Sequence, residues 1–216
     1  AFPAIWGLGV KYRVNADFNQ YQVDRMADYF RNNHIPCDVF GLEPGWQTAS
    51  YSCSYVWNKK LFPSANEFID TMKERGFHLN LWEHAFVSQQ SPLYEPLKNH
   101  AGNYLVWNGL VPDFADTKAA DIFANYHEET FVKKGISGFK LDECDNSNIA
   151  FGRNAWSFPD LSSFPSGIDG EQMHQLFGIL YQKTIFNIYK KLNQRTYLDV
   201  RASNAFASSY PAALYS

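Results

Sequence analysis

Short apolar runs and longer amphipathic stretches alternate along the whole chain. The apolar runs are rich in β-branched and aromatic residues, and each is followed by a polar or aromatic cluster. Runs of this length and composition predict buried β-strands. We predict five strands, at residues 5–12, 37–42, 77–82, 138–141 and 197–200.

The stretches between these strands repeat apolar residues at helical spacing. Val23 and Met26 recur in this way within the first stretch, and such spacing places apolar side chains on one face of an α-helix. Ser64 followed by Glu67 indicates a capping box, and Gly76 is an expected helix stop. We predict helices at residues 20–33, 65–75, 119–134 and 171–193.

Regular alternation of strands and helices predicts an α/β fold with a parallel sheet. A barrel is favoured over an open doubly wound sheet, because no GxGxxG follows the first strand and because charged and aromatic residues crowd the C-terminal ends of the strands. Five strands cannot close an eight-stranded barrel. We therefore expect a (β/α)8 TIM barrel present only in part, with about five βα units across residues 1–216, and an inserted loop at 146–170.

The fourth predicted strand ends in a cluster of charges. Three carboxylates, Asp142, Glu143 and Asp145, follow Lys140 within five residues. Lys140 has the same parity as Asp142, so both side chains should share a face of the strand, and the ammonium would keep the carboxylate ionised. An ionised, positioned carboxylate is what a glycosidase nucleophile must be. The alternative is a structural ion-pair network at a strand end.

Other strand ends carry groups that could bind hydroxyls. The second presents Glu43 and Trp46, the third presents Trp82, and the fifth presents Arg201. Carboxylates and guanidinium groups make charge-assisted hydrogen bonds to sugar hydroxyls, and a Trp ring can stack on a sugar, so the set is compatible with a monosaccharide pocket. Each Trp could instead belong to the core, and Arg201 could pair with Asp199 or another nearby carboxylate.

Composition excludes several other classes of partner. The net charge is −3 and the basic residues are scattered, which argues against binding to nucleic acid or to an anionic membrane. No apolar run is long enough to span a bilayer. The six His residues show no HxH or HExxH arrangement, and the three Cys residues show no CxxC spacing, so we predict no metal site. Aromatic residues make up 17% of the chain, which suits a sugar site but also fills cores.

Several motifs, in this order and spacing, resemble glycoside hydrolase family 31, which contains α-glucosidases, α-xylosidases and α-galactosidases. The likeness covers nearly the whole chain. The segments that carry it are Gly-Phe-His-Leu-Asn-Leu-Trp at 76–82, Trp-Asn-Gly at 107–109, Pro-Asp-Phe-Ala-Asp at 112–116, Gly-Phe-Lys-Leu-Asp at 138–142, Asp-Gly-Glu-Gln-Met-His at 169–174 and Val-Arg-Ala-Ser-Asn-Ala-Phe-Ala at 200–207.

The resemblance implies roles for individual residues. It makes Asp142 the nucleophile, places Trp107 against the sugar and gives Arg201 a substrate-binding role near the acid/base. Leu-Tyr-Ser at 214–216 resembles the start of the turn that carries the acid/base in the family, so that residue is expected just after Ser216. The resemblance implies no cofactor. It also implies that the remainder of the same polypeptide completes the barrel and that this chain alone is inactive.

Two departures from the family pattern bear on the substrate. Family α-glucosidases usually have an Asp-containing turn where this chain has Glu43, and a Trp where it has Lys140. A longer acid and an added cation reshape the hydroxyl-binding side of the pocket, which favours an α-galactosidase or α-N-acetylgalactosaminidase. The alternatives are an α-glucosidase or α-xylosidase of the same family, a Schiff-base aldolase or lyase using Lys140, and a non-catalytic carbohydrate-binding barrel.

Overall fold

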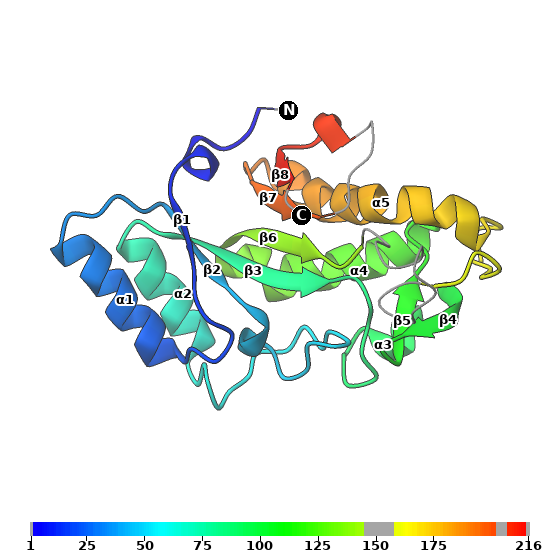
Figure 1. Ribbon diagram of the computed structural model, residues 1–216, viewed down its shortest axis with the longest axis horizontal. Coiled ribbons are helices and arrows are strands. Elements are labelled where there is room, and N and C mark those ends of the chain that lie inside the picture. The colour runs from blue at the N-terminus through cyan, green and yellow to red at the C-terminus, as the bar shows by residue number, and fades with distance from the viewer. Residues whose placement is uncertain (1, 145–157, 202–206, 215–216) are drawn as a thin grey trace.

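The computed structural model describes residues 2–144, 158–201 and 207–214 of the chain (Figure 1). The strands are β1 (Lys11–Arg13), β2 (Val39–Leu42), β3 (His78–His84), β4 (Ala101–Val106), β5 (Gly109–Pro112), β6 (Ile136–Asp142), β7 (Leu198–Val200) and β8 (Ala212–Leu214). The α-helices are α1 (Gln20–Asn32), α2 (Ala65–Glu74), α3 (Tyr94–Leu97), α4 (Thr117–Thr130) and α5 (Gly170–Lys191). Short 3-10 helices are η1 (Ile5–Leu8), η2 (Pro44–Trp46), η3 (Val132–Lys134) and η5 (Ala207–Ser209).

Six of these strands form one parallel sheet in the order β1-β2-β3-β6-β7-β8. The spatial order follows the chain order, without the reversal that defines a doubly wound sheet. Each new strand is therefore added on the same side of the last, as in a barrel. The sheet with its helices is an incomplete (β/α)8 barrel, which confirms the predicted fold class.

Alternate residues of each strand face opposite sides of the sheet. On β6, Phe139 packs against Phe131 and His127 from the helix layer, while Lys140 and Asp142 face the inner side. Burying a Phe side chain contributes about 1.5–3 kcal/mol, so the outward-facing residues hold the helices in place. The inner face near the strand ends remains for polar groups.

The helix ends follow local sequence signals, with one correction. Asn19 and Gln22 form a reciprocal capping box at the start of α1, which the sequence analysis did not predict. The predicted capping box at Ser64 and Glu67 is wrong, because the Ser64 side chain makes no cap hydrogen bond. Its backbone angles, φ −123° and ψ 58°, differ from the extended conformation usual for a capping residue. Gly135, with φ 113°, lies at the end of η3.

Several elements differ from the predicted strands. Residues 5–8 form the 3-10 helix η1, and the first strand begins only at Lys11. The structure adds β8, the short helix α3 and an antiparallel hairpin of β4 and β5. Trp107 and Asn108 form the hairpin turn with φ values of 49° and 58°, which are typical of a two-residue primed turn.

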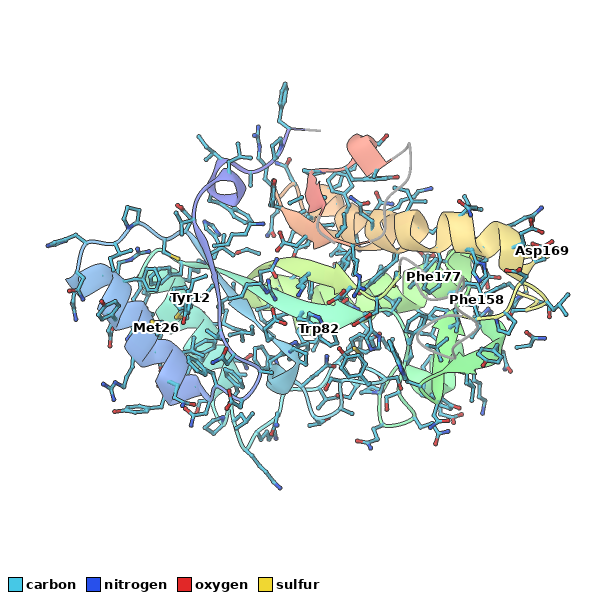
Figure 2. All side chains as sticks on the ribbon, in the orientation of Figure 1. Tyr12, Met26, Trp82, Phe158, Asp169 and Phe177 are labelled. Atoms are coloured by element: carbon cyan, nitrogen blue, oxygen red, sulfur yellow. The ribbon has the colours of Figure 1, made fainter. Side chains whose placement is uncertain are left out.

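Part of the predicted inserted loop at 146–170 lies outside the described residues. Its described part packs against the start of α5: the ring of Phe158 contacts those of His174 and Phe177, and Asp169 caps the helix through its side chain (Figure 2). The loop's position over the site stays a prediction.

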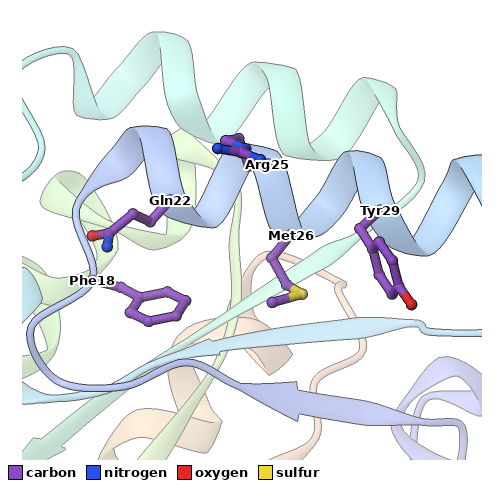
Figure 3. A pocket seen from close by; sticks show the side chains of 5 residues that line it. All are labelled: Phe18, Gln22, Arg25, Met26 and Tyr29. Carbon is purple, nitrogen blue, oxygen red and sulfur yellow. The ribbon is translucent and has the colours of Figure 1, made fainter.

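A pocket of about 350 Å³ lies along α1 (Figure 3). The pocket is lined by Phe18, Gln22, Arg25, Met26 and Tyr29.

None of the described helices is long and apolar enough to cross a membrane.

Candidate active site

Asp142 is the last residue of β6, and its carboxylate is fixed by three donors. Trp82 donates from Nε1 to Oδ2 at 2.7 Å, and Nη1 of Arg201 lies 3.1 Å from Oδ1. The backbone N–H of Glu143 donates to the same Oδ1 at 2.9 Å. Donors to both oxygens stabilise the ionised form of a carboxylate. Asp142 is 6% exposed, so these contacts replace most of its hydration.

The strand register explains why these groups meet. In the pairing of β3 with β6, Trp82 lies opposite Lys140 and His84 lies opposite Asp142. Directly paired residues point to the same face of a sheet. Lys140 and Asp142 also share that face, as their spacing predicts, and Nζ lies 3.6 Å from Oδ2.

Glu43 follows β2 and joins the same group from the other side. Its Oε1 contacts Nε of Arg13 and lies 3.7 Å from Nζ of Lys140. Arg13 can reach this position because Gly41 lies beneath it; a Cβ at Gly41 would lie 2.5 Å from Nη1 of Arg13. Glu43 therefore already has two cationic partners on the inner face.

Charges of alternating sign form a continuous chain along this face. Nη1 of Arg13 lies 3.7 Å from Oδ2 of Asp199, which is also paired with Lys11. Arg201 pairs with Asp142 and Glu143. These are nearby carboxylate partners of the kind considered for Arg201 from the sequence. The ion-pair network considered for this strand end is present, in the order Lys11, Asp199, Arg13, Glu43, Lys140, Asp142, Arg201, Glu143.

An aromatic wall lies beside the carboxylates. The ring of Tyr51 contacts those of Trp82, His84 and Trp107, with centroids 4.9–5.5 Å apart. Burial lowers the pKa of His84 to about 3, so its ring is neutral at ordinary pH. Burial, followed by the charges of Glu143 and Asp142, raises the pKa of Tyr51. The Tyr51 hydroxyl therefore stays protonated and can donate.

Trp46 lies in the core and not in this wall. It is 1% exposed, and its ring packs edge-on against Trp57 and Phe131. Its Nε1 donates to the backbone carbonyl of Trp82 at 2.7 Å. In this structure Trp46 thus supports the strand that carries Trp82, which is the core alternative weighed for this residue.

A buried polar cluster holds the outer side of β3. Tyr181 of α5 donates to Oε1 of Glu83 at 2.6 Å, and Nε2 of His127 from α4 lies 3.1 Å from Oε2. All three residues are fully buried. Since Glu83 lies between Trp82 and His84, this cluster fixes the segment that presents both rings to the site.

The structure brings together Glu43, Trp82, Lys140, Asp142 and Arg201 on one face, with Trp107 in the adjoining wall. Sequence analysis did not identify Arg13 or Tyr51. Arg13 directly follows the first apolar run, which is the same strand-end signal that marked the others. Tyr51 lies in an irregular segment, where no periodicity indicates its direction. Within the described residues no group of three or more His, Cys, Asp or Glu side chains could hold a metal ion. The cysteines Cys37, Cys53 and Cys144 are buried.

The model of the family described as "Glycosyl hydrolases family 31 TIM-barrel domain" matches residues 1–216. The chain belongs to glycosyl hydrolase family 31. It is similar to an α-xylosidase from Emericella nidulans, with 24% identity over 220 residues, covering 95% of this chain and 27% of that protein.

Two solved structures of the family have the same fold. The GH31 dextranase of Flavobacterium johnsoniae, complexed with glucose, has a TM-score of 0.84 and 21% identity, covering 100% of this chain and 28% of that one. A GH31 α-xylosidase from a soil metagenome, complexed with xylose, has a TM-score of 0.79 and 15% identity, covering 96% of this chain and 31% of that one. This chain thus spans under a third of the length of each of these three similar proteins.

Proposed function

We propose that the complete protein is a retaining α-glycoside hydrolase with Asp142 as its nucleophile. Membership of family 31 and the geometry of Asp142 support this proposal. Hydrogen-bond donors reach both of its oxygens, and the carboxylate stands at the C-terminal end of a barrel strand, where barrel enzymes carry their catalytic groups. A carboxylate held ionised in this way can attack an anomeric carbon.

The proposed reaction is a double displacement. A carboxylate oxygen of Asp142 forms a bond to the anomeric carbon as the bond to the leaving-group oxygen breaks, and an acid protonates that oxygen. Water then attacks the anomeric carbon and displaces the aspartate. The residue that acted as the acid in the first step now acts as the base and takes the proton of this water. Two carboxyl groups about 5–5.5 Å apart are needed. We place the acid/base just after Ser216 in the complete protein.

The remainder of the polypeptide is proposed to complete the barrel. The described sheet ends at β1 and β8. An eight-stranded barrel joins its end strands through further strands and covers them with helices. The share of its relatives that this chain covers leaves room for these elements.

The names of the relatives support an α-xyloside or α-glucoside as the substrate. One relative and one solved structure are named α-xylosidases, and the dextranase was solved with glucose. These names favour the α-glucosidase or α-xylosidase alternative over the α-galactosidase expected from Glu43 and Lys140. The pair also has a local role, because Lys140 lies between the carboxylates of Glu43 and Asp142 and so balances their charges.

The same contacts disfavour a Schiff-base role for Lys140. A Schiff-base lysine attacks a carbonyl as an uncharged amine, whereas Nζ of Lys140 lies 3.6 and 3.7 Å from two carboxylate oxygens that stabilise an ammonium. A non-catalytic carbohydrate-binding barrel would differ from the proposed hydrolase only in lacking the acid/base residue. A complete sequence without a carboxylate in the turn after Ser216 would support binding only.

The decisive experiment compares nitrophenyl α-xyloside, α-glucoside and α-galactoside with the complete protein and its Asp142→Asn variant. We expect hydrolysis of the xyloside or glucoside, loss of turnover in the variant, and covalent labelling of Asp142 by a fluorinated glycosyl donor. Normal turnover by a folded Asp142→Asn variant would assign Asp142 to the ion-pair network alone. A marked preference for the galactoside would contradict the proposed substrate, and borohydride trapping of a carbonyl substrate on Lys140 would support the lyase.

A further inference from the structure

Glu143, which follows the nucleophile strand, has a left-handed backbone conformation. Its φ is 58°, and the residue is 7% exposed. This conformation costs a residue with a Cβ about 1–2 kcal/mol, and burying a carboxylate adds a desolvation cost. Glycine would avoid both. Such an outlier beside a candidate site motivates a functional explanation for the side chain.

The carboxylate of Glu143 is held at both oxygens. Nη1 of Arg201 lies 3.0 Å from Oε2, and the Tyr51 hydroxyl donates to Oε1 at 3.3 Å. The ring of Tyr51 is in turn packed edge-on against Trp107, with centroids 4.9 Å apart. The carboxylate therefore has a defined position relative to Arg201.

Arg201 uses the same nitrogen for Asp142. Nη1 lies 3.1 Å from Oδ1 of Asp142 and 3.0 Å from Oε2 of Glu143, so one end of the guanidinium serves two carboxylates. Sharing reduces the stabilisation that Arg201 gives to the Asp142 anion, and the nearby negative charge of Glu143 reduces it further. The backbone N–H of Glu143 acts in the opposite direction by donating to Oδ1.

We propose that Glu143 is a positioning residue that holds Arg201 between two carboxylates and thereby sets the ionisation and nucleophilicity of Asp142. This inference rests on the proposed function of Asp142. Its chemical reason is that a carboxylate nucleophile must be ionised, while strong pairing with a guanidinium lowers its reactivity. The Glu143 side chain limits that pairing and keeps Arg201 in place when sugar is bound.

The test uses the complete protein with Glu143→Gln, which keeps the size of the side chain and removes its charge. Arg201 then pairs more fully with Asp142. We expect the acidic limb of the kcat/KM profile to move down by about one pH unit and the plateau to fall about tenfold. Glu143→Asp retains the charge and should keep the limb at the wild-type position. Glu95→Gln removes a charge from an exposed ion pair with Lys98 and should change neither value.

The same shift can be followed without turnover. In protein labelled with [13C]aspartate at the carboxyl carbon, the Asp142 resonance, assigned from Asp142→Asn, should titrate at lower pH in Glu143→Gln. An unchanged titration and acidic limb in a folded variant would overturn the proposal, and so would a rise in KM alone, which would make Glu143 a substrate-binding group. Failure of the wild-type protein to hydrolyse any α-glycoside would reject the proposed function, while the titration would still report on the coupling.

Discussion

The indole nitrogen of Trp82 lies 2.7 Å from Oδ2 of Asp142. The other carboxylate oxygen, Oδ1, contacts Arg201. A hydrogen bond to a charged group contributes about 1.5–3 kcal/mol. Trp82→Phe also leaves Oδ2 without the donor that fixes the orientation of the carboxylate. Because a misplacement of about 1 Å can cost about a hundredfold in rate, kcat/KM of the complete protein should fall about ten- to a hundredfold. Because the anion loses a donor, the acidic limb of the pH profile should move up, opposite to the shift expected for Glu143→Gln.

The control for this change is Trp57→Phe. The Trp57 ring packs against Trp46 and Phe62, so this variant alters core packing without removing a donor to Asp142. Similar pH profiles for the two variants, measured on the same substrate, would show that the indole of Trp82 acts through packing alone.

The order of the strands could be predicted from the sequence because the apolar runs are separated by helices of ordinary length. The face of the sheet to which a side chain points could be predicted from the alternation of residues along a strand. Parity placed Lys140 beside Asp142, and the distance of 3.6 Å confirms it. The first strand was misplaced because residues 5–8 are apolar but include Gly7, and a Cβ there would lie 2.3 Å from the Tyr197 ring. A tight tertiary contact of this kind has no signal in local periodicity.

The short elements and the wall residues lie beyond such reasoning. β8 has three residues, too few to show an alternating pattern. Tyr51 reaches Glu143 across 92 positions of sequence, from a segment without regular structure. Trp46 and Trp82 both follow or end apolar runs and are equally buried, yet only Trp82 donates to Asp142. Only the packing of η2 against β3 separates the two cases.

Tyr181→Phe tests the buried cluster behind β3. The variant leaves Oε1 of Glu83 without the hydroxyl that donates to it at 2.6 Å, and an unsatisfied buried charged group costs about 1–3 kcal/mol or more. We expect the free energy of unfolding, measured by denaturant titration of the complete protein, to fall by about that amount. Tyr104→Phe, at an exposed position of β4, should change it by less than about 0.5 kcal/mol. Equal values for the two variants would contradict the role of the cluster.

Glu143→Gly and Glu143→Ala separate backbone strain from side-chain function. Both remove the carboxylate that contacts Arg201 and Tyr51, so both should show the same loss of activity. Glycine adopts φ 58° without the penalty that alanine bears. We therefore expect the glycine variant to unfold with a free energy about 1 kcal/mol higher than the alanine variant. Indistinguishable unfolding curves would mean that the left-handed conformation carries no measurable strain.

His84 should make the folded state sensitive to acid. Burial lowers its pKa to about 3 from 6.5, so between these values the unfolded chain binds a proton at this ring and the folded chain does not. The free energy of unfolding therefore rises with pH across this window, and stability is lost as pH falls below 6.5. A single group contributes a slope of up to about 1.4 kcal/mol per pH unit.

His84→Phe removes this titration and keeps an aromatic ring beside Tyr51 and Trp107. As pH rises from 7 to 8 the His84 ring becomes neutral in the unfolded state as well, so the difference in unfolding free energy between wild type and variant should level off there. From pH 6 to 4 the wild-type protein should lose more stability than the variant, by about 1 kcal/mol for each pH unit. If denaturant titration gave parallel pH profiles of the unfolding free energy for wild type and variant, the His84 ring would have to be protonated within the folded protein as readily as in the unfolded chain.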